Sequence, residues 1–406
     1  MMKQTIRDIR EFAAKRVLVR VDFNVPLSRQ DNSITDNSRI RESLPTIQYL
    51  INRKAKVIIC SHLGRPDGKV VEKLKMLPIA KELANLIHLP VKTVNDCIGS
   101  KVTSMVDSLK AGEILVLENL RFHAEEEAND PAFAQKLAQL ADIYVDDAFG
   151  TAHRAHASTE GVAHYLPAYA GFLMEKELNS LGHILATPRH PFAALLGGAK
   201  ASDKINLIKN ILDKVDMVLI GGGMAATFLK NQGCEVGRSL IEPDKIDLTH
   251  QLVITAQQNN IAFLFPVDVM VSDRIDVCSN LNTVSVNAIP PNAFIVDIGT
   301  ETIELFSQQL KTCQTIFWNG PMGIYEVPEF SHGTREMMQL IASRNMATTV
   351  IGGGSTAEIA QEMGLVNKLT HVSTGGGASL QFLEGEKLPG VEVLLNKDLI
   401  GGVEKI

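Results

Sequence analysis

The sequence predicts an α/β protein with two doubly wound, parallel-sheet domains of the Rossmann-like kind, joined by a long helix and a hinge. Buried-strand patterns alternate with helix patterns along the chain, and polar or glycine-rich loops follow the strands. At 406 residues the chain also exceeds the size at which one hydrophobic core keeps growing. Two sheets, each covered by helices, satisfy all three observations.

The helix pattern over 171–186, which Pro188 ends, separates two strand-rich halves. We therefore expect an N-terminal domain over 1–170, an interdomain helix over 171–186 and a C-terminal domain over 187–390. The tail over 391–406 is expected to return to the N-terminal domain.

Composition narrows the class of protein. A net charge of −6 and an isoelectric point near 6.0 argue against nucleic acid or an anionic membrane as a partner. Five scattered cysteines without a C-x-x-C pair favour reduced thiols and a cytoplasmic location. The sequence shows neither a signal peptide nor a membrane-spanning stretch.

Polar side chains follow the strands of the first half. Strand patterns cover 15–21, 55–60, 113–117 and 143–147, and helix patterns cover 38–52 and 77–88. Asp22 and Asn24 come directly after the first strand, at the end where open parallel sheets bind ligands. They are candidates for orienting a hydroxylated substrate, and an ordinary Asx turn is the alternative.

Cationic side chains gather at the same predicted edge. Arg39 stands in the first turn of its helix, where the helix dipole gives a cation no advantage. The others follow separate strands: His62, Arg65, Arg121 and Arg154. Each alone could be a solvated surface charge, but their convergence in an acidic protein would be costly without a bound polyanion.

The second half opens with a strand over 192–196, a Gly197-Gly198 turn and a helix over 205–212. Such a turn lets a backbone approach an anion, and helix N-terminal amides favour phosphate. Lys200 and Lys204 would share one helical face if the helix has begun by then. The alternative is a solvated lysine pair beside a tight turn, and the stretch is not a Walker A loop.

Glycine-rich loops follow the later strands. Strand patterns over 215–220, 315–318 and 348–351 lead into Gly221–Gly223, Asn319–Gly323 and Gly352–Thr356, and Ser373–Gly377 comes last. Several such loops suggest a nucleotide lying along backbone amides. A tightly wound α/β domain that needs glycine turns for packing alone is the alternative.

Eight motifs spread in order over nearly the whole chain resemble those of the phosphoglycerate kinase family. They are RVDFNVP (20–26), SHLGRP (61–66), LENLRFH (117–123), GTAHRAHAS (150–158), GGAKASDKI (197–205), GGGM (221–224), WNGPMG (318–323) and STGGGAS (373–379). The resemblance implies reversible phosphoryl transfer from 1,3-bisphosphoglycerate to ADP, giving 3-phosphoglycerate and ATP in glycolysis and gluconeogenesis. It also implies Mg²⁺ bound with ATP or ADP, a monomer, and hinge bending about the helix over 171–186 and Ser373-Thr374.

Site residues carry over from the same motifs. The phosphoglycerate is expected to contact Asp22, Phe23, Asn24, Arg39, His62, Leu63, Gly64, Arg65, Arg121 and Arg154. The nucleotide is expected to contact Lys204, Gly221, Gly222, Gly223, Asn319, Pro321, Glu326, Gly353, Gly354, Ser355 and Thr356. For the transferring phosphoryl group we predict charge from Arg39 and Lys200, assisted by the amides of Gly353 and Gly376.

The chemistry needs no general base, because the acceptor is a carboxylate already ionised at neutral pH. Alignment and positive charge on the phosphoryl oxygens are what it needs.

Two positions depart from the family pattern. Ser355 stands where the family usually has a Mg²⁺-contacting aspartate, and Gln381 stands where it usually has glutamate. No metal ligand is therefore assigned. A weakly active relative that binds nucleotide and phosphoglycerate is the alternative function, and a kinase for another carboxylate would need a rebuilt first-domain site.

Overall fold

The computed structural model describes residues 2–28 and 30–397, which form two compact units. The first unit comprises the described residues up to 179 together with 387–397, and the second comprises 180–386. The division falls inside helix α6 (Phe172–Ala186), whereas the sequence suggested boundaries at the two ends of that helix. The return to the first unit begins at 387 rather than 391, and 398–406 of the expected tail lie outside the described residues.

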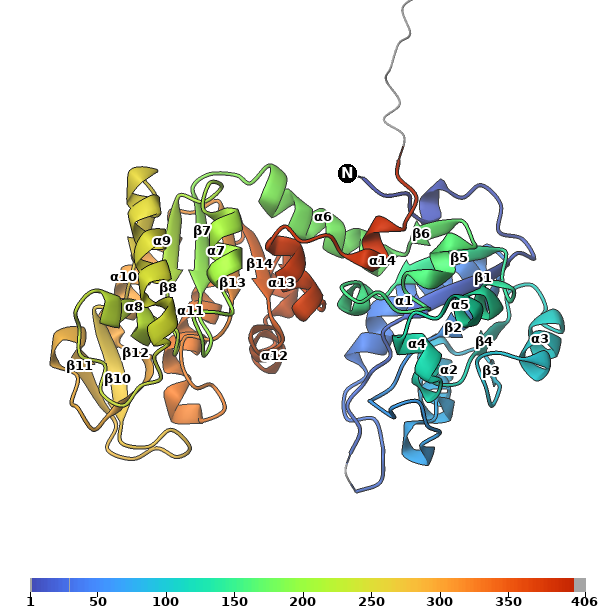
Figure 1. Cartoon of the computed structure of the whole chain (residues 1–406), viewed down its shortest axis with the longest axis horizontal. Coiled ribbons are helices and arrows are strands. Elements are labelled where there is room, and N and C mark those ends of the chain that lie inside the picture. The colour runs from blue at the N-terminus through green and yellow to red at the C-terminus, as the bar shows by residue number, and fades with distance from the viewer. Residues whose placement is uncertain (1, 29, 398–406) are drawn as a thin grey trace, which may run out of the picture. The chain divides into compact units, whose positions relative to one another are not determined.

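The first unit is built on a six-stranded sheet whose strand pairs are all parallel, in the order β3-β4-β2-β1-β5-β6 (Figure 1). Its strands are β1 (Arg16–Val21), β2 (Lys56–Cys60), β3 (Val91–Thr93), β4 (Ile114–Val116), β5 (Ile143–Asp147) and β6 (Ala168–Ala170). Its helices are α1 (Ser38–Asn52), α2 (Leu77–Ile87), α3 (Ser100–Asp107), α4 (Ala124–Glu127), α5 (Pro131–Ala138) and α14 (Pro389–Glu392). The four strands predicted here are confirmed, and the short edge strands β3 and β6 were missed.

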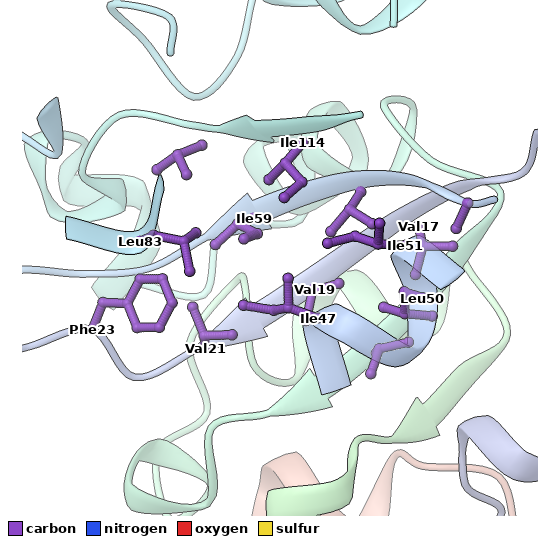
Figure 2. Close-up of a cluster of buried hydrophobic side chains, with 14 of the residues drawn as sticks. Val17, Val19, Val21, Phe23, Ile47, Leu50, Ile51, Ile59, Leu83 and Ile114 are labelled. Atoms are coloured by element: carbon purple, nitrogen blue, oxygen red, sulfur yellow. The ribbon is translucent and has the colours of Figure 1, made fainter. Parts of the chain in front are cut away.

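Strand β1 shows why this sheet forms. Val17, Val19 and Val21 alternate along it, so they share one face, and all three are fully buried. Figure 2 shows them against Ile47 and Leu50 of α1. β-branched residues suit a pleated surface, and burial on both faces gives a central parallel strand its continuous apolar pattern. The opposite face of β1 carries two arginines, Arg16 at the start of the strand, which is partly buried, and Arg20, which is buried.

The second unit has its own six-stranded sheet, again with parallel pairs throughout, in the order β15-β14-β13-β7-β8-β9. Its strands are β7 (Phe192–Leu196), β8 (Met217–Ile220), β9 (Ala262–Leu264), β13 (Thr315–Asn319), β14 (Thr348–Gly352) and β15 (His371–Val372). Its helices are α7 (Ile205–Ile211), α8 (Ala225–Asn231), α9 (Ile246–Gln258), α10 (Thr300–Leu310), α11 (His332–Ala342), α12 (Gly354–Glu362) and α13 (Gly377–Leu383).

A small antiparallel sheet in the second unit was not predicted. It has the order β11-β10-β12, with β10 (Asp268–Ser272), β11 (Asn282–Ser285) and β12 (Phe294–Ile298). The buried carboxylate of Asp268 accepts hydrogen bonds from the amides of Glu301 and Thr302 at 3.1 and 2.8 Å. It thereby satisfies the first turn of α10 and ties this sheet to the helix that follows.

The chain returns to the first unit beside its N-terminus. Leu395 donates its amide to Ala168 of β6 at 3.0 Å, and Gln4 donates to the carbonyl of Leu395 at 2.7 Å. Gly390 also donates to Ala152 at 2.9 Å. Residues 387–397 thus complete the first unit beyond the edge strand. Among the described residues, no helix has the length and apolarity needed to span a bilayer.

Candidate active site

The carboxyl ends of β1 and β2 bring three predicted side chains together. Asp22 follows β1 and forms an ion pair with Arg39, the second residue of α1. His62 follows β2, and its Nδ1 lies 3.8 Å from an Asp22 oxygen. The Arg39 side chain is 40% exposed whereas that of His62 is 4% exposed. Arg39 can therefore meet a ligand from solvent while His62 forms the base of the site.

His62 is held as a neutral ring. Burial lowers its pKa well below the ordinary value, and the charges of Arg20, Arg121, Arg154 and Arg39 lower it further. Its Nδ1 lies 3.2 Å from a guanidinium nitrogen of Arg20, which has only protons to offer. Nδ1 therefore accepts that hydrogen bond, and Nε2 carries the proton. His62 is a neutral donor that feels the charges of four arginines. Three of them, Arg39, Arg121 and Arg154, belong to the predicted set.

Arg20 contacts His62 but was not among the site residues predicted from the sequence. It lies inside β1, is 1% exposed, and donates from Nε to the Ser158 hydroxyl at 2.9 Å. Ser158 in turn donates its hydroxyl and amide to the buried carboxylate of Glu126 at 2.5 and 3.0 Å. Arg20 therefore contacts His62 directly and is connected to the Glu126 carboxyl group through Ser158. A charge between the two buried valines Val19 and Val21 was the available signal.

Arg121 and Arg154 border the same cluster, from the segments after β4 and β5. Arg121 donates from Nη1 to the Gly64 carbonyl at 2.8 Å, and its Nε lies 3.1 Å from Glu127. Burial is the main reason that the pKa of Arg121 is lowered. Arg154 is half-buried, and its Nε donates to His153 at 3.2 Å. Arg65, by contrast, is exposed.

Asn24 has a structural partner of its own. Its side-chain oxygen accepts the Gly64 amide at 2.8 Å, and its amide donates to Asp22 at 3.3 Å. The latter is the Asx turn that we considered as the alternative. Phe23 and Leu63 are buried and donate their amides to Ser61 and Asn119. Asn24, Phe23, Leu63 and Gly64 therefore shape the loops around the cations.

The glycine loops of the second unit lock into one another. Gly198 donates its amide to the Pro321 carbonyl and Gly222 donates to the Met322 carbonyl, both at 2.9 Å, while Gly221 donates to Leu196 at 2.8 Å. A Cβ on Gly222 would lie 2.6 Å from the Gly198 nitrogen and 2.7 Å from the Pro321 oxygen, and Gly222 has a φ of +65°. The amides of Gly221 and Gly222 are thus engaged within the protein. Tight winding explains these two glycines.

The glycines at α12 and α13 are different. Ideal Cβ atoms on Gly354 and Gly376 would meet nothing within 4 Å. Gly354 begins α12, and Gly376 immediately precedes α13 with a φ of +53°. Gly353, with a φ of +88°, has the Asn319 side chain nearest to its Cβ position, at 3.3 Å. Open space beside these backbones leaves room for a ligand to approach.

Lys204, Asn319 and Thr356 connect three loops of the second unit. The Lys204 ammonium donates to the buried Asn319 side-chain oxygen, and burial lowers the pKa of Lys204. The buried Thr356 hydroxyl accepts the Gly320 amide at 2.9 Å. Lys200 is exposed. Lys200 and Lys204 do not meet the condition for sharing a helical face, because α7 begins at Ile205 and a turn precedes it.

Position 355 offers little to a metal ion. Ser355 is partly buried and carries a neutral hydroxyl. The Tyr325 hydroxyl donates to Glu358 at 3.3 Å. Glu326 is exposed, and Pro321 is partly buried in the interlocked loops. Mg²⁺ prefers carboxylate, carbonyl and water oxygens, so the neutral hydroxyl of Ser355 is a weak ligand. A nucleotide-bound Mg²⁺ would fit here mainly through phosphate and water oxygens.

Comparisons with known proteins give the family. A family model described as phosphoglycerate kinase matches residues 6–386. The phosphoglycerate kinase of Moorella thermoacetica is 52% identical over 397 residues, covering 98% of this chain and 100% of that protein. That of Pelotomaculum thermopropionicum is 53% identical over 397 residues, with the same coverage.

Solved structures agree. The chain superimposes on phosphoglycerate kinase from Coxiella burnetii with a TM-score of 0.87 at 38% identity, covering 96% of this chain and 98% of that one. The enzyme from Pyrococcus horikoshii gives a TM-score of 0.80 at 33% identity, with the same coverage. Since the family model, the relatives and the fold agree over almost the full length, this chain belongs to the phosphoglycerate kinase family of phosphotransferases.

Proposed function

We propose that the first unit binds the phosphoglycerate and the second binds the nucleotide in the reaction of this family, the reversible transfer of a phosphoryl group from 1,3-bisphosphoglycerate to ADP. The observation that carries the proposal is the set of cations around the neutral His62: Arg20, Arg39, Arg121 and Arg154. Like charges at this density repel one another, and a multiply charged anion relieves that repulsion. A phosphorylated carboxylate is such an anion.

The roles within the first unit follow from exposure and partners. Arg121 and Arg154 are proposed to hold the phosphate of phosphoglycerate, with Arg65 at the solvent side. The neutral His62 would donate a hydrogen bond from Nε2 to the substrate, and the Asp22 carboxylate would accept a hydrogen bond from the substrate hydroxyl. Arg39 is proposed to turn from Asp22 toward the transferring group, because its guanidinium is the exposed member of that pair. Positive charge there stabilises the transition state.

The second unit is proposed to bind nucleotide largely through its backbone. The open Gly354 and Gly376 positions favour approach of phosphate to the backbone, and α12 begins at Gly354, directly after Gly353. Lys204 would add charge beneath the polyphosphate, because Asn319 holds its ammonium group in the loop region. Lys200 is exposed, which suits a group that must reach the phosphoryl in flight. Glu326 and the 221–223 turn are proposed to border the nucleoside.

Mg²⁺ enters as the partner of ATP or ADP and would neutralise phosphate charge in the transition state. Ser355 supplies no charge to it, so we propose that the nucleotide and water provide most of its ligands. Hinge bending about α6 and Ser373-Thr374, a monomeric state and a cytoplasmic location remain proposals from the sequence. Closure would serve transfer by excluding water from the reactants.

A steady-state assay from 3-phosphoglycerate and ATP, coupled to NADH consumption, tests the proposal. We expect turnover that depends on Mg²⁺ and saturates with both substrates. In Ser355→Asp, affinity for Mg-ADP should rise several-fold while affinity for metal-free ADP falls, because an added anion attracts the metal and repels phosphate. If calorimetry shows that both ligands bind but the assay shows no turnover, the alternative is favoured, namely a relative that binds nucleotide and phosphoglycerate with little activity.

A further inference from the structure

Three metal-ligating side chains of the first unit lie together outside the proposed active site. Asp96 and Cys97 follow β3, and His123 follows the 3₁₀ turn Leu120–Phe122. One carboxylate oxygen, the thiol sulfur and one imidazole nitrogen all lie within 4.8 Å of one another. Segments far apart in the sequence therefore deliver three different donor types to one point.

Backbone hydrogen bonds fix the three residues where they stand. The Asp96 backbone carbonyl accepts a hydrogen bond from the Glu118 amide at 3.3 Å, and the His123 amide donates to the Leu120 carbonyl at 3.2 Å. The Asp96 side chain accepts the Cys97 amide at 2.7 Å and lies 2.7 Å from His123 Nε2. The His123 ring also packs on Phe133, with ring centroids 5.2 Å apart. Little ordering would remain to be done when an ion arrives.

The donor set selects a chemical class. A thiolate and an imidazole suit Zn²⁺ and related ions, whereas Mg²⁺ takes oxygen ligands. A tetrahedral Zn²⁺ with bonds of about 2.0–2.3 Å holds its ligand atoms roughly 3.3–3.7 Å apart. Donors within 4.8 Å reach that geometry by shifts of about 1 Å, which side-chain rotation of Asp96 and His123 can supply.

Burial gives the site a direction of entry. The Cys97 thiol is fully buried, the His123 side chain is 27% exposed and that of Asp96 is 51% exposed. Asp96 also lines a cavity of about 700 Å³ beside α3, together with Ser100 and Ser104. An ion would meet the two outer ligands first and the sulfur last, and a water ligand would approach from the solvent side of Asp96 and His123.

We propose that Asp96, Cys97 and His123 form a site for a thiophilic divalent cation of the Zn²⁺ class, with water in the fourth position. On binding, the thiol gives its proton to solvent and the sulfur forms the metal bond. The hydrogen bond between Asp96 and His123 is replaced by a metal bond from each. This site is separate from the Mg²⁺ that accompanies the nucleotide, and the proposal does not depend on the proposed function.

Co²⁺ titration of the full-length protein without substrates tests it, because a thiolate ligand gives an intense near-ultraviolet charge-transfer absorption. We expect saturation at one ion per chain, loss of the absorption when Zn²⁺ is added, and no competition from excess Mg²⁺. Asp96→Asn and His123→Ala should weaken Zn²⁺ binding at least about tenfold, because loss of an outer partner alone costs that much. Cys97→Ser should abolish the charge-transfer absorption.

Matched controls come from the other cysteines. Cys278→Ser removes an exposed thiol and Cys234→Ser a half-buried one, and both variants should bind as the parent does. Circular dichroism checks that each variant folds, and the half-exposed Asp96 gives a variant that spares the core if Cys97→Ser does not. An absorption that survives in Cys97→Ser or disappears in Cys278→Ser overturns the site. An unchanged Zn²⁺ affinity in Asp96→Asn and His123→Ala would also overturn the site. The contact between Asp96 and His123 would then be a structural hydrogen bond only.

Discussion

The two units present different chemistry at the ends of their parallel strands. In the first, the charges of four arginines act on His62, and hydrogen bonds link the buried Arg20 to Ser158 and Glu126. In the second, backbone loops interlock around glycines such as Gly222. The first unit therefore presents positioned cationic side chains, and the second presents main-chain groups of glycine-rich loops.

This difference shows that glycines in similar loops can be required for different physical reasons. Gly222 has no room for a Cβ, so packing requires glycine there. Gly354 has open space beside it, so packing does not require glycine at that position. An open glycine beside a helix start is the better candidate for ligand approach. In the first unit the corresponding distinction is exposure: Arg39 faces solvent and Arg20 does not.

The largest effect is expected from Arg39→Ala. We predict that kcat falls about 10³-fold or more while KM for 3-phosphoglycerate changes far less, because the arginine is proposed to act on the phosphoryl group in flight. Steady-state kinetics give both constants, and Arg39→Lys should recover part of the rate. A loss confined to KM would make Arg39 a ground-state clamp.

Gly222→Ala should damage the fold of the second unit. Its positive φ and the backbone atoms 2.6 and 2.7 Å from the added Cβ predict a loss of about 3 kcal/mol or more in unfolding free energy. The buried Trp318 is the chain's one tryptophan, so its fluorescence reports unfolding of this unit. Gly354→Ala is the matched control, expected to keep stability within about 1 kcal/mol and to weaken ADP binding. Equal stability of the two variants would contradict the distinction.

Lys204→Ala and Lys200→Ala should separate binding from rate. Lys204 is held by Asn319, so its removal should weaken ADP binding by about 1–3 kcal/mol, the range for a hydrogen-bonded charge. Lys200 is exposed, so its removal should lower kcat and largely spare ADP affinity. Calorimetric titration with ADP beside steady-state rates measures both. The same loss of ADP affinity in both variants would refute the separation.

A pH dependence of the first unit's stability is also expected. Burial raises the pKa of Asp147 to about 7, although its carboxylate accepts the Leu173 amide at 2.8 Å. The folded state then holds the proton more tightly than the unfolded state, so this group's contribution to stability falls as pH rises from about 4 to about 7.

Asp147→Asn should therefore gain stability relative to the parent across that window, by up to about 1.4 kcal/mol per pH unit. Burial lowers the pKa of His156 to about 4, which contributes the opposite slope in both proteins and cancels in the difference. Urea unfolding at several pH values measures it, with the exposed Asp107→Asn as control. A constant gap between Asp147→Asn and the parent would show that Asp147 does not carry this dependence.

Much of the fold was predictable because central strands have a local signal. Val17, Val19 and Val21 alternate on one face, and every such run led into a polar or glycine-rich loop. The edge strands β3 and β6 are three residues each and are not buried throughout, unlike the equally short β4, whose three apolar residues are all buried. The antiparallel sheet was missed because β11 is mostly exposed and polar, so pairing with β10 rather than its own pattern defines it.

The site was predictable where side chains carry it. Arg39, His62, Arg121 and Arg154 followed from their positions after strands or early in a helix, and from the family motifs. Arg20 could have been found as a charge between two valines of a predicted strand. The separation of Gly222 from Gly354 could not, because it depends on which loops lie opposite each glycine in space.

Calorimetric titration of two variants with both ligands tests the central claim most directly, namely that charged side chains of the first unit bind phosphoglycerate and the open backbone of the second binds nucleotide. Arg154→Ala should lose affinity for 3-phosphoglycerate and keep its affinity for ADP. Gly354→Ala should lose affinity for ADP and keep its affinity for 3-phosphoglycerate. Crossed losses, or a loss of both ligands in either folded variant, would contradict the division of labour between the two units.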